Sequence, residues 1–223
     1  MLKSIQSLKE LIYPEICLCC GKTGAKICDN CSRYWLAKPT RSKVDNNWLF
    51  FVATYDEATS QVILAAKESG NKDAVKLIAR SIASSVSFAI VNLGISQPIN
   101  LVTIPSQLSA IRRRGRDHIK DLAQEVIIQL NQQDINAICL PILKPIKKIK
   151  DQSDLNGLQR KENMNHAFTV KSSPISQSTV ILIDDLVTTG ASIQEGVRAL
   201  GEAKITVDAV VTACAVGRNS LIR

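Results

Sequence analysis

Residues 180–192 read Val-Ile-Leu-Ile-Asp-Asp-Leu-Val-Thr-Thr-Gly-Ala-Ser, and this stretch indicates the fold more clearly than any other. Four apolar, mostly β-branched residues lead into the carboxylates Asp184 and Asp185, as in a buried strand with an acidic end. A short loop of small and hydroxyl residues follows, and then a helical pattern over 193–200. Ligands of open α/β sheets bind at the carboxyl ends of strands, and backbone N–H groups at a helix start hold phosphate. The stretch therefore predicts a site for a ligand with a phosphate at one end and hydroxyl groups at the other.

The rest of the chain alternates between strand-like and helix-like patterns. Short apolar runs rich in β-branched residues predict strands at 48–55, 99–104, 136–143, 179–183 and 205–213. Apolar residues at helical spacing predict helices at 57–68, 72–92, 116–132, 156–165 and 193–200. Such alternation is typical of a parallel sheet flanked by helices, so the expected fold class is α/β. An ordinary strand, turn and capped helix is the alternative to a ligand site at 180–192.

Composition and charge limit the class of protein. The chain has 223 residues, of which 45% are hydrophobic and only 4% aromatic, so we expect an aliphatic core of the kind found in parallel sheets. A net charge of +8 and a pI of about 9.2 favour an anionic partner, whether a nucleotide, a nucleic acid or a membrane surface. No secretory signal is evident and no apolar run approaches bilayer-spanning length, so we expect a soluble, cytoplasmic protein without a membrane span.

Five of the seven cysteines lie between positions 17 and 31. Two Cys-x-x-Cys pairs separated by seven residues have the spacing of a zinc ribbon, in which four thiolates surround a structural Zn²⁺. Cys19 is left out of this set, because using it in place of a neighbour would give a Cys-x-Cys spacing. A redox pair and unliganded core thiols are the alternatives. The predicted metal ligands are Cys17, Cys20, Cys28 and Cys31.

These patterns divide the chain into three parts. Residues 1–38 would contain a short amphipathic N-terminal helix and the small zinc-ribbon-like domain. The polar residues 39–47 are interpreted as a linker, and 48–223 as the α/β domain. Cys139 and Cys214 lie alone in apolar, strand-like segments, so we expect both to pack in the core.

An arginine-rich segment lies between the strand at 99–104 and the helix at 116–132. Planar guanidinium groups bind phosphate and pyrophosphate through paired hydrogen bonds. A solvated basic loop or a nucleic-acid patch is the alternative interpretation. His118 is either a polar residue at a helix start or a ligand contact. The candidate residues of this segment are Ser106, Arg112, Arg113, Arg114 and His118.

The motif at 180–192 resembles the signature of the type I phosphoribosyltransferases, which bind 5-phosphoribosyl 1-pyrophosphate (PRPP). By this resemblance, Asp184 and Asp185 would be the catalytic pair that contacts the ribose 2- and 3-hydroxyls. The arginine-rich segment would bind pyrophosphate, and Mg²⁺ would accompany PRPP. The 5-phosphate would be held by the loop after the acids, which comprises Leu186, Val187, Thr188, Thr189, Gly190, Ala191 and Ser192.

Nearly the whole chain resembles the ComF family, which joins an N-terminal cysteine knuckle to a type I phosphoribosyltransferase core and is known from bacterial competence. The resemblance implies phosphoribosyl transfer from PRPP to an unidentified acceptor, with a role in DNA uptake. The alternative is a non-catalytic PRPP sensor that binds single-stranded DNA, although few aromatic residues are present to stack on bases. A family pattern recurs in register at Gln152, Leu155, Arg160, Asn163, Ala167 and Phe168.

The same resemblance suggests partners and acceptor chemistry. The partners would be PRPP, single-stranded DNA with the DNA-uptake machinery, and a second copy of the chain in a homodimer. Residues 114–118 replace the usual Arg-Gly-Phe-Asn-Gln, 105–106 the usual Pro-Leu, and 213–215 the usual Leu-Ala-Arg, so the departures concern the acceptor side. Thr188 stands where purine-salvage members carry an acid, and a Thr cannot act as that general base. An acceptor of the purine-salvage kind is therefore not expected.

Overall fold

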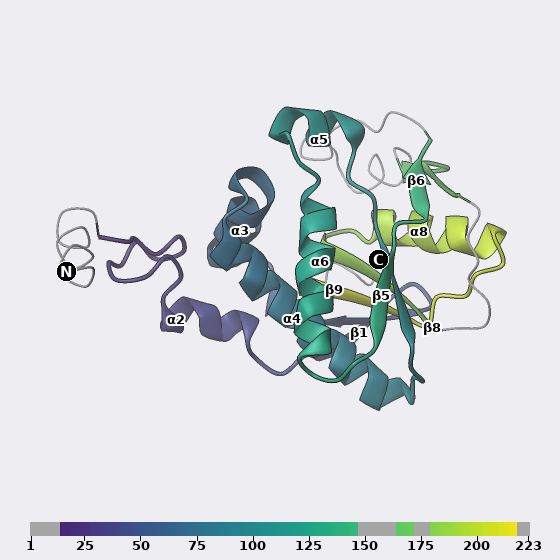
Figure 1. The fold of residues 1–223 in the computed structure, drawn as a ribbon, viewed down its shortest axis with the longest axis horizontal. Helices are drawn as coiled ribbons and strands as arrows, with labels where there is room; N and C mark the ends of the chain where they lie inside the picture. The colour runs from purple at the N-terminus through teal and green to yellow at the C-terminus, as the bar shows by residue number, and fades with distance from the viewer. Residues whose placement is uncertain (1–13, 147–163, 172–178, 218–223) are drawn as a thin grey trace.

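The computed structural model describes residues 14–146, 164–171 and 179–217 (Figure 1). Its centre is a seven-stranded sheet of order β1-β2-β9-β8-β4-β5, in which β3 also pairs with β9. All neighbouring strands are parallel except β1 and β2. A separate antiparallel pair is formed by β6 and β7. The strands are β1 (Thr40–Val44), β2 (Asn47–Phe51), β3 (Ala53–Thr54), β4 (Ile99–Thr103), β5 (Ala137–Leu140), β6 (Leu143–Pro145), β7 (Phe168–Val170), β8 (Thr179–Val187) and β9 (Ala209–Ala215).

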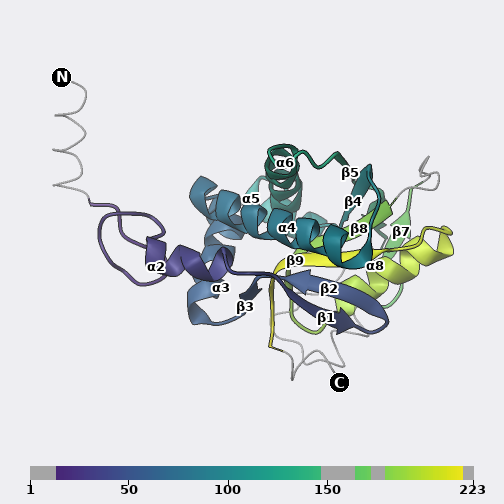
Figure 2. The same cartoon turned by 90° about the horizontal axis from the view of Figure 1, so that it is seen from below.

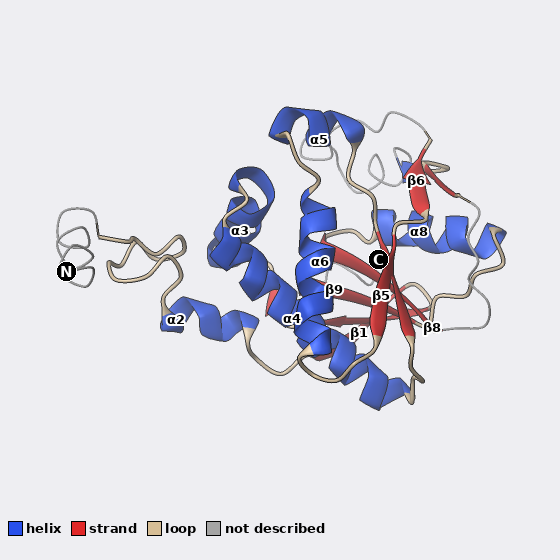
Figure 3. Ribbon diagram, viewed as in Figure 1, coloured by secondary structure: helices blue, strands red, loops and turns tan. Residues whose placement is uncertain are grey.

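Helices cover both faces of this sheet, as Figures 2 and 3 show. The helices α4 (Lys72–Leu93) and α6 (His118–Asn131) pack against each other on one face, and α8 (Ala191–Glu202) lies on the other with β6 and β7. This arrangement confirms the expected α/β class with a mostly parallel sheet. The shorter helical segments are α2 (Asp29–Ser32), the 3₁₀ helix η1 (Arg33–Trp35), α3 (Glu57–Leu64), the π-helix η2 (Ala65–Ser69) and α5 (Leu108–Arg114).

The core consists of two aliphatic layers, one on each face of the sheet. Side chains alternate across β8, so that Ile181 and Ile183 join the layer under α4 and α6, while Val180 and Leu182 join the layer under α8. In α8, Gly196 lies so close to the sheet that a Cβ there would be 2.7 Å from Ile104 Cδ1. Cys214 is fully buried and Cys139 packs against the core, as expected from the sequence.

Helix α4 corrects the expectation that no segment approaches bilayer-spanning length. It has 22 residues and an apolar window of mean hydropathy 1.6, which is long and apolar enough to cross a membrane. In the fold, however, it packs on β2, β9 and α6, and ten of its residues are buried. The helix is apolar because it is the central helix of the core.

Several boundaries differ from the sequence-based expectation. Residues 39–47, expected to be a linker, contain strand β1, whose Arg41 and Lys43 lie over the Trp48 ring at 3.5 and 4.5 Å. These cation–π contacts and pairing with β2 allow a polar sequence to form a strand. The strand expected at 136–143 is divided into β5 and β6, because Pro141 between them has no N–H to donate to a ladder.

Other differences lengthen, shorten or divide elements. Strand β8 continues four residues beyond 183, because Asp184, Leu186 and Val187 stay in register with β9. Strand β9 begins at 209 rather than 205, and the strand expected at 48–55 is divided between β2 and β3. The expected N-terminal helix lies outside the described residues, as do residues 156–163 of the helix expected at 156–165 and Gln152, Leu155, Arg160 and Asn163 of the ComF pattern.

Candidate functional site

A cleft of about 670 Å³ opens at the carboxyl ends of β4 and β8. This edge of the sheet is where ligands bind in open α/β folds, and the volume suits a small phosphorylated ligand. Its walls come from η2, the β4–α5 connection, the start of α6 and the β8–α8 connection. The charged and polar residues lining it are Lys67, Glu68, Ser106, Gln107, Ser109, Arg113, Arg114, His118, Asp184, Asp185, Thr188, Thr189 and Ser192.

The two acids at the end of β8 have different surroundings. Asp185 is 5% exposed, and its Oδ2 lies 3.2 Å from Nε2 of His118 and 3.8 Å from Nζ of Lys67. Asp184 is partly exposed toward the cleft, and its Oδ1 accepts the backbone N–H of Asp185 at 2.9 Å. Asp185 is therefore held by protein side chains, whereas part of Asp184 is open to the cleft.

These surroundings shift the two pKa values in opposite directions. Burial and the charge of Asp185 raise the pKa of Asp184 well above its ordinary value of 3.8. Burial would also raise the pKa of Asp185, but the Lys67 ammonium and the His118 hydrogen bond outweigh it and lower that pKa. The charge of Asp185 in turn raises the pKa of Lys67.

His118, the first residue of α6, connects the acid pair to the arginines. Its Nδ1 lies 3.0 Å from Nη1 of Arg114 and 3.2 Å from Oγ of Ser106. A guanidinium can only donate hydrogen bonds, so Nδ1 must be the unprotonated acceptor. With Nδ1 as the acceptor, Nε2 is the nitrogen that donates to Oδ2 of Asp185. His118 and Ser106 both line the cleft.

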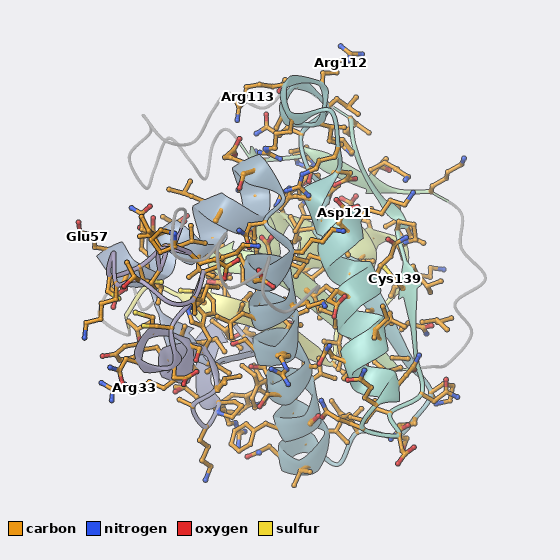
Figure 4. All side chains as sticks on the ribbon, turned by 60° about the vertical axis from the view of Figure 1, so that its left-hand side comes forward. Arg33, Glu57, Arg112, Arg113, Asp121 and Cys139 are labelled. Carbon is orange, nitrogen blue, oxygen red and sulfur yellow. The ribbon has the colours of Figure 1, made fainter. Side chains whose placement is uncertain are left out.

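The arginine-rich segment forms helix α5 rather than an irregular loop, and Gly115 ends it with a positive φ of 70°. The side chain of Arg114 is 5% exposed and its Nε donates to Oε1 of Glu68 at 3.0 Å. Arg113 is largely exposed and approaches Oε2 of the same Glu68 at 3.6 Å. Arg112 is exposed and does not line the cleft, although its role in pyrophosphate binding was expected. Figure 4 shows Arg112 and Arg113 at one end of the molecule.

The loop between β8 and α8 is shorter than the segment that the sequence predicted to bind a phosphate. Leu186 and Val187 belong to β8, and Ala191 and Ser192 belong to the first turn of α8, which leaves 188–190 as the loop. At its end, Gly190 is buried with a φ of 78° and precedes the helix directly. The N–H of Ala191 lies 3.5 Å from Oγ1 of Thr189. Free N–H groups of a helix start are the usual phosphate ligands, and residues 188–192 line the cleft.

Gly190 should not tolerate a side chain. A Cβ at this position would lie 2.7 Å from Cγ1 of Val44, and its backbone is left-handed. We expect Gly190→Ala to lower the free energy of unfolding by about 1 to 3 kcal/mol, measured by urea denaturation. Gly201→Ala is the control, because it lies in the same helix with no atom within 4 Å of its Cβ position. That variant should gain up to about 1 kcal/mol, and equal stabilities of the two variants would contradict the prediction.

The four predicted metal ligands converge in the structure. The Sγ atoms of Cys17, Cys20, Cys28 and Cys31 all lie within 4.8 Å of one another, so the cluster could hold a metal such as zinc. The backbone N–H of Cys28 donates to Sγ of Cys17 at 3.4 Å. Burial alone would raise the pKa of Cys17, but N–H groups facing the sulfur lower it to about 6, which favours the thiolate that metals bind.

Cys19 lies outside this cluster. It packs against the hydrophobic core, and burial raises its pKa to about 11. The knuckle is tied to the α/β domain by Lys26, which contacts Asp73 of α4 at 3.4 Å, and by the buried Trp35 of η1.

Because four thiols converge without Cys19, we expect purified protein to carry one zinc per chain by atomic absorption. Cys28→Ser should lose this zinc, and the matched Cys19→Ser should retain it. Retention by both variants would contradict the assignment.

Sequence reasoning missed three residues around the cleft. Lys67 and Glu68 were placed at the end of an ordinary helix at 57–68, but the π-helical turn of η2 directs both side chains into the cleft. Arg116 fixes this turn, because its guanidinium donates to the carbonyls of Ala66 and Lys67. It also donates to Asp121 at 2.8 Å. The run of arginines just before Arg116 was the only signal in the sequence, since a π turn such as η2 has no clear sequence pattern.

Comparisons with known proteins give a likeness of fold. The sequence matches no protein-family model, and no curated protein matches it significantly. The structure is similar to adenine phosphoribosyltransferase from Trypanosoma brucei, solved with AMP, pyrophosphate and ribose-5-phosphate (12% identity, TM-score 0.42). It is also similar to adenine phosphoribosyltransferase from Leishmania donovani (12% identity, TM-score 0.36). Each match covers 81% of this chain and 90% of the other.

Proposed function

We propose that this protein binds PRPP in the cleft and transfers its phosphoribosyl group to an acceptor. The observation that carries the proposal is the order of groups along one wall. A partly exposed acid, Asp184, is followed closely along the chain by the loop 188–190 and the start of α8, while Arg113 and Arg114 of α5 line the same cleft. Hydroxyl acceptors, phosphate-binding amides and pyrophosphate-binding guanidinium groups are the three contacts that PRPP requires.

The chemistry assigned to each group follows from its position. The bond between ribose C1 and pyrophosphate would break through an oxocarbenium-like state, so the site must orient the ribose and stabilise the departing charge. Asp184 would accept hydrogen bonds from ribose hydroxyls, while the backbone N–H of Asp185 donates to its Oδ1. Arg113 and Arg114 would bind the pyrophosphate as it leaves. The acceptor would enter with its own nucleophile, since Thr188 offers no general base in the loop.

Mg²⁺ fits this proposal as a companion of PRPP rather than as a metal with its own protein cage. Of the two acids, Asp185 is already bound by Lys67 and His118, which leaves Asp184 as the carboxyl available in the cleft. One or two carboxylates plus substrate phosphates are the usual environment of Mg²⁺. The ion would neutralise pyrophosphate charge, while the side chains of this chain orient the ligand.

The proposal is tested by thermal denaturation with PRPP and with its parts. At about 100 times its dissociation constant, a ligand stabilises the folded state by about 2.7 kcal/mol, which raises the Tm of a chain this size by roughly 5 to 10 °C. We expect Mg²⁺ with PRPP to give that rise, and ribose 5-phosphate and pyrophosphate to give smaller ones. A rise with pyrophosphate alone, and none with PRPP, would contradict the proposal.

A second candidate function is single-stranded DNA binding in DNA uptake, with PRPP as a regulatory ligand and catalysis absent. The resemblance to ComF proteins supports it, and so does a surface of β1 and β2 where Arg41 and Lys43 lie over Trp48. Exposed arginine and lysine side chains such as these bind nucleic acid through contacts to its phosphates. We expect fluorescence anisotropy of a labelled oligonucleotide to show affinity that falls steeply with salt. Turnover of PRPP with any acceptor would favour the transferase.

A further inference from the structure

The charged side chains that line the cleft form ion pairs with one another. Glu68 of η2 contacts both of the arginines that line the cleft, Arg114 at 3.0 Å and Arg113 at 3.6 Å. Its neighbour Lys67 has the opposite charge and contacts Asp185. The wide π turn thus places an anion on the cationic wall and a cation on the acidic wall, and π turns are frequent at functional sites.

In this arrangement Glu68 places a negative charge on the arginines, as the pyrophosphate of the proposed ligand would. A carboxylate and a phosphoryl oxygen both bind a guanidinium through the same N–H groups. Arg114 is almost fully buried, and a buried guanidinium requires an anionic partner. In the described part of the chain, Glu68 supplies the carboxylate that contacts it. A pyrophosphate in the cleft would therefore compete with Glu68 for Arg113 and Arg114.

We propose that Glu68 is a built-in competitor that sets how tightly the cleft takes a pyrophosphate group. The inference rests on the proposed function for its ligand, but concerns a residue that has no contact role in that proposal. Because Glu68 is 42% exposed, its carboxylate can turn toward solvent when an anion displaces it. The π turn itself would stay in place, since Arg116 binds the carbonyls of Ala66 and Lys67.

The sign of the expected effect separates this role from a positioning role. If Glu68 competes with the ligand, its removal tightens anion binding. If Glu68 instead orients the arginines for the ligand, its removal weakens binding. Glu68 is 42% exposed, and ion pairs with an exposed partner are weak individually, so two of them lead us to expect about three- to tenfold tighter binding in Glu68→Gln.

The experiment is calorimetric titration of inorganic pyrophosphate, and separately of PRPP with Mg²⁺, into wild type and Glu68→Gln. Glu57→Gln is the matched control, because it removes the same charge from an exposed position outside the cleft lining (Figure 4). We expect about three- to tenfold tighter pyrophosphate binding in Glu68→Gln and a change below about twofold in Glu57→Gln.

The two proposals fail in different ways in this experiment. Equal or weaker pyrophosphate binding by Glu68→Gln, or equal tightening in Glu57→Gln, overturns the competitor role. Failure of both wild type and Glu68→Gln to bind pyrophosphate overturns it as well. If pyrophosphate binds and is tightened while PRPP does not bind, the competitor role holds and the proposed function fails.

Discussion

Asp184→Asn is expected to make the protein more stable while weakening PRPP binding, and Asp185→Asn is expected to make it less stable. The pKa of Asp184 is raised in the folded state by burial and by Asp185, so the folded protein holds this proton more tightly than the unfolded chain. Stability therefore falls as pH rises from about 4 through the folded pKa. An Asn carries no charge and removes this penalty, while its Oδ1 can still accept the Asp185 N–H. Each tenfold difference in proton affinity is about 1.4 kcal/mol.

The opposite sign for Asp185 follows from its contacts. Its pKa is lowered in the folded state, so its contribution is fully present above the ordinary value of 3.8 and is lost as pH falls through the folded pKa. Asp185→Asn leaves Lys67 and His118 without their charged partner, and we expect a loss of about 1 to 3 kcal/mol at neutral pH. Urea denaturation at pH 4.5 and pH 8 measures the free energy of unfolding of both variants. A destabilised Asp184→Asn at pH 8 would contradict the assigned pKa directions.

The second large effect is expected at Glu195 of α8. Its carboxylate is 5% exposed, accepts the backbone N–H of Phe168 at 2.9 Å, and binds Arg198 through contacts of 2.7 and 2.8 Å. Arg198 also donates to the carbonyl of Phe168 at 3.1 Å. The pair thus joins β7 to the helix whose start forms the proposed phosphate site. Arg198 is 26% exposed and would keep Glu202 as its partner, so we expect Glu195→Ala to lose about 1 to 3 kcal/mol through the unpaired N–H of Phe168 and the lost contacts to Arg198.

Glu202→Ala provides the control for Glu195. Glu202 binds the same Arg198, but its side chain is 65% exposed. Exposed ion pairs contribute up to about 1 kcal/mol, so this variant should remain close to wild type in urea denaturation. Similar losses in the two variants would show that burial of Glu195 has no special importance for the attachment of β7.

The sequence contained the main layout of the fold because hydrophobic periodicity is a local property. Alternating patterns predicted the parallel sheet and its helices, and spacing alone predicted that Cys17, Cys20, Cys28 and Cys31 converge. Strand β1 was missed because its stability comes from pairing with β2 and from Trp48, which lie outside its own sequence. Likewise, β8 extends past its apolar run because β9 offers a partner for residues 184–187.

The candidate site was predictable only in part. The paired acids and the glycine loop follow one another in the chain, so their neighbourhood could be inferred. Lys67 and Glu68 come from a segment more than a hundred residues earlier than the acids, and a π turn changes which side chains face the cleft. The tautomer of His118 depends on Arg114 and Asp185 together, a contact that only the folded structure creates.

The most direct test of the central claim is calorimetric titration of PRPP with Mg²⁺ into wild type and Asp184→Asn. Because Asp184→Asn is expected to be at least as stable as wild type, lost binding could not be attributed to misfolding. We expect roughly micromolar binding by wild type, and binding about tenfold to a hundredfold weaker in Asp184→Asn, since a hydrogen bond to a charged group is lost. Absence of binding by folded wild type, or equal affinity in the two proteins, would contradict a PRPP site at the end of β8.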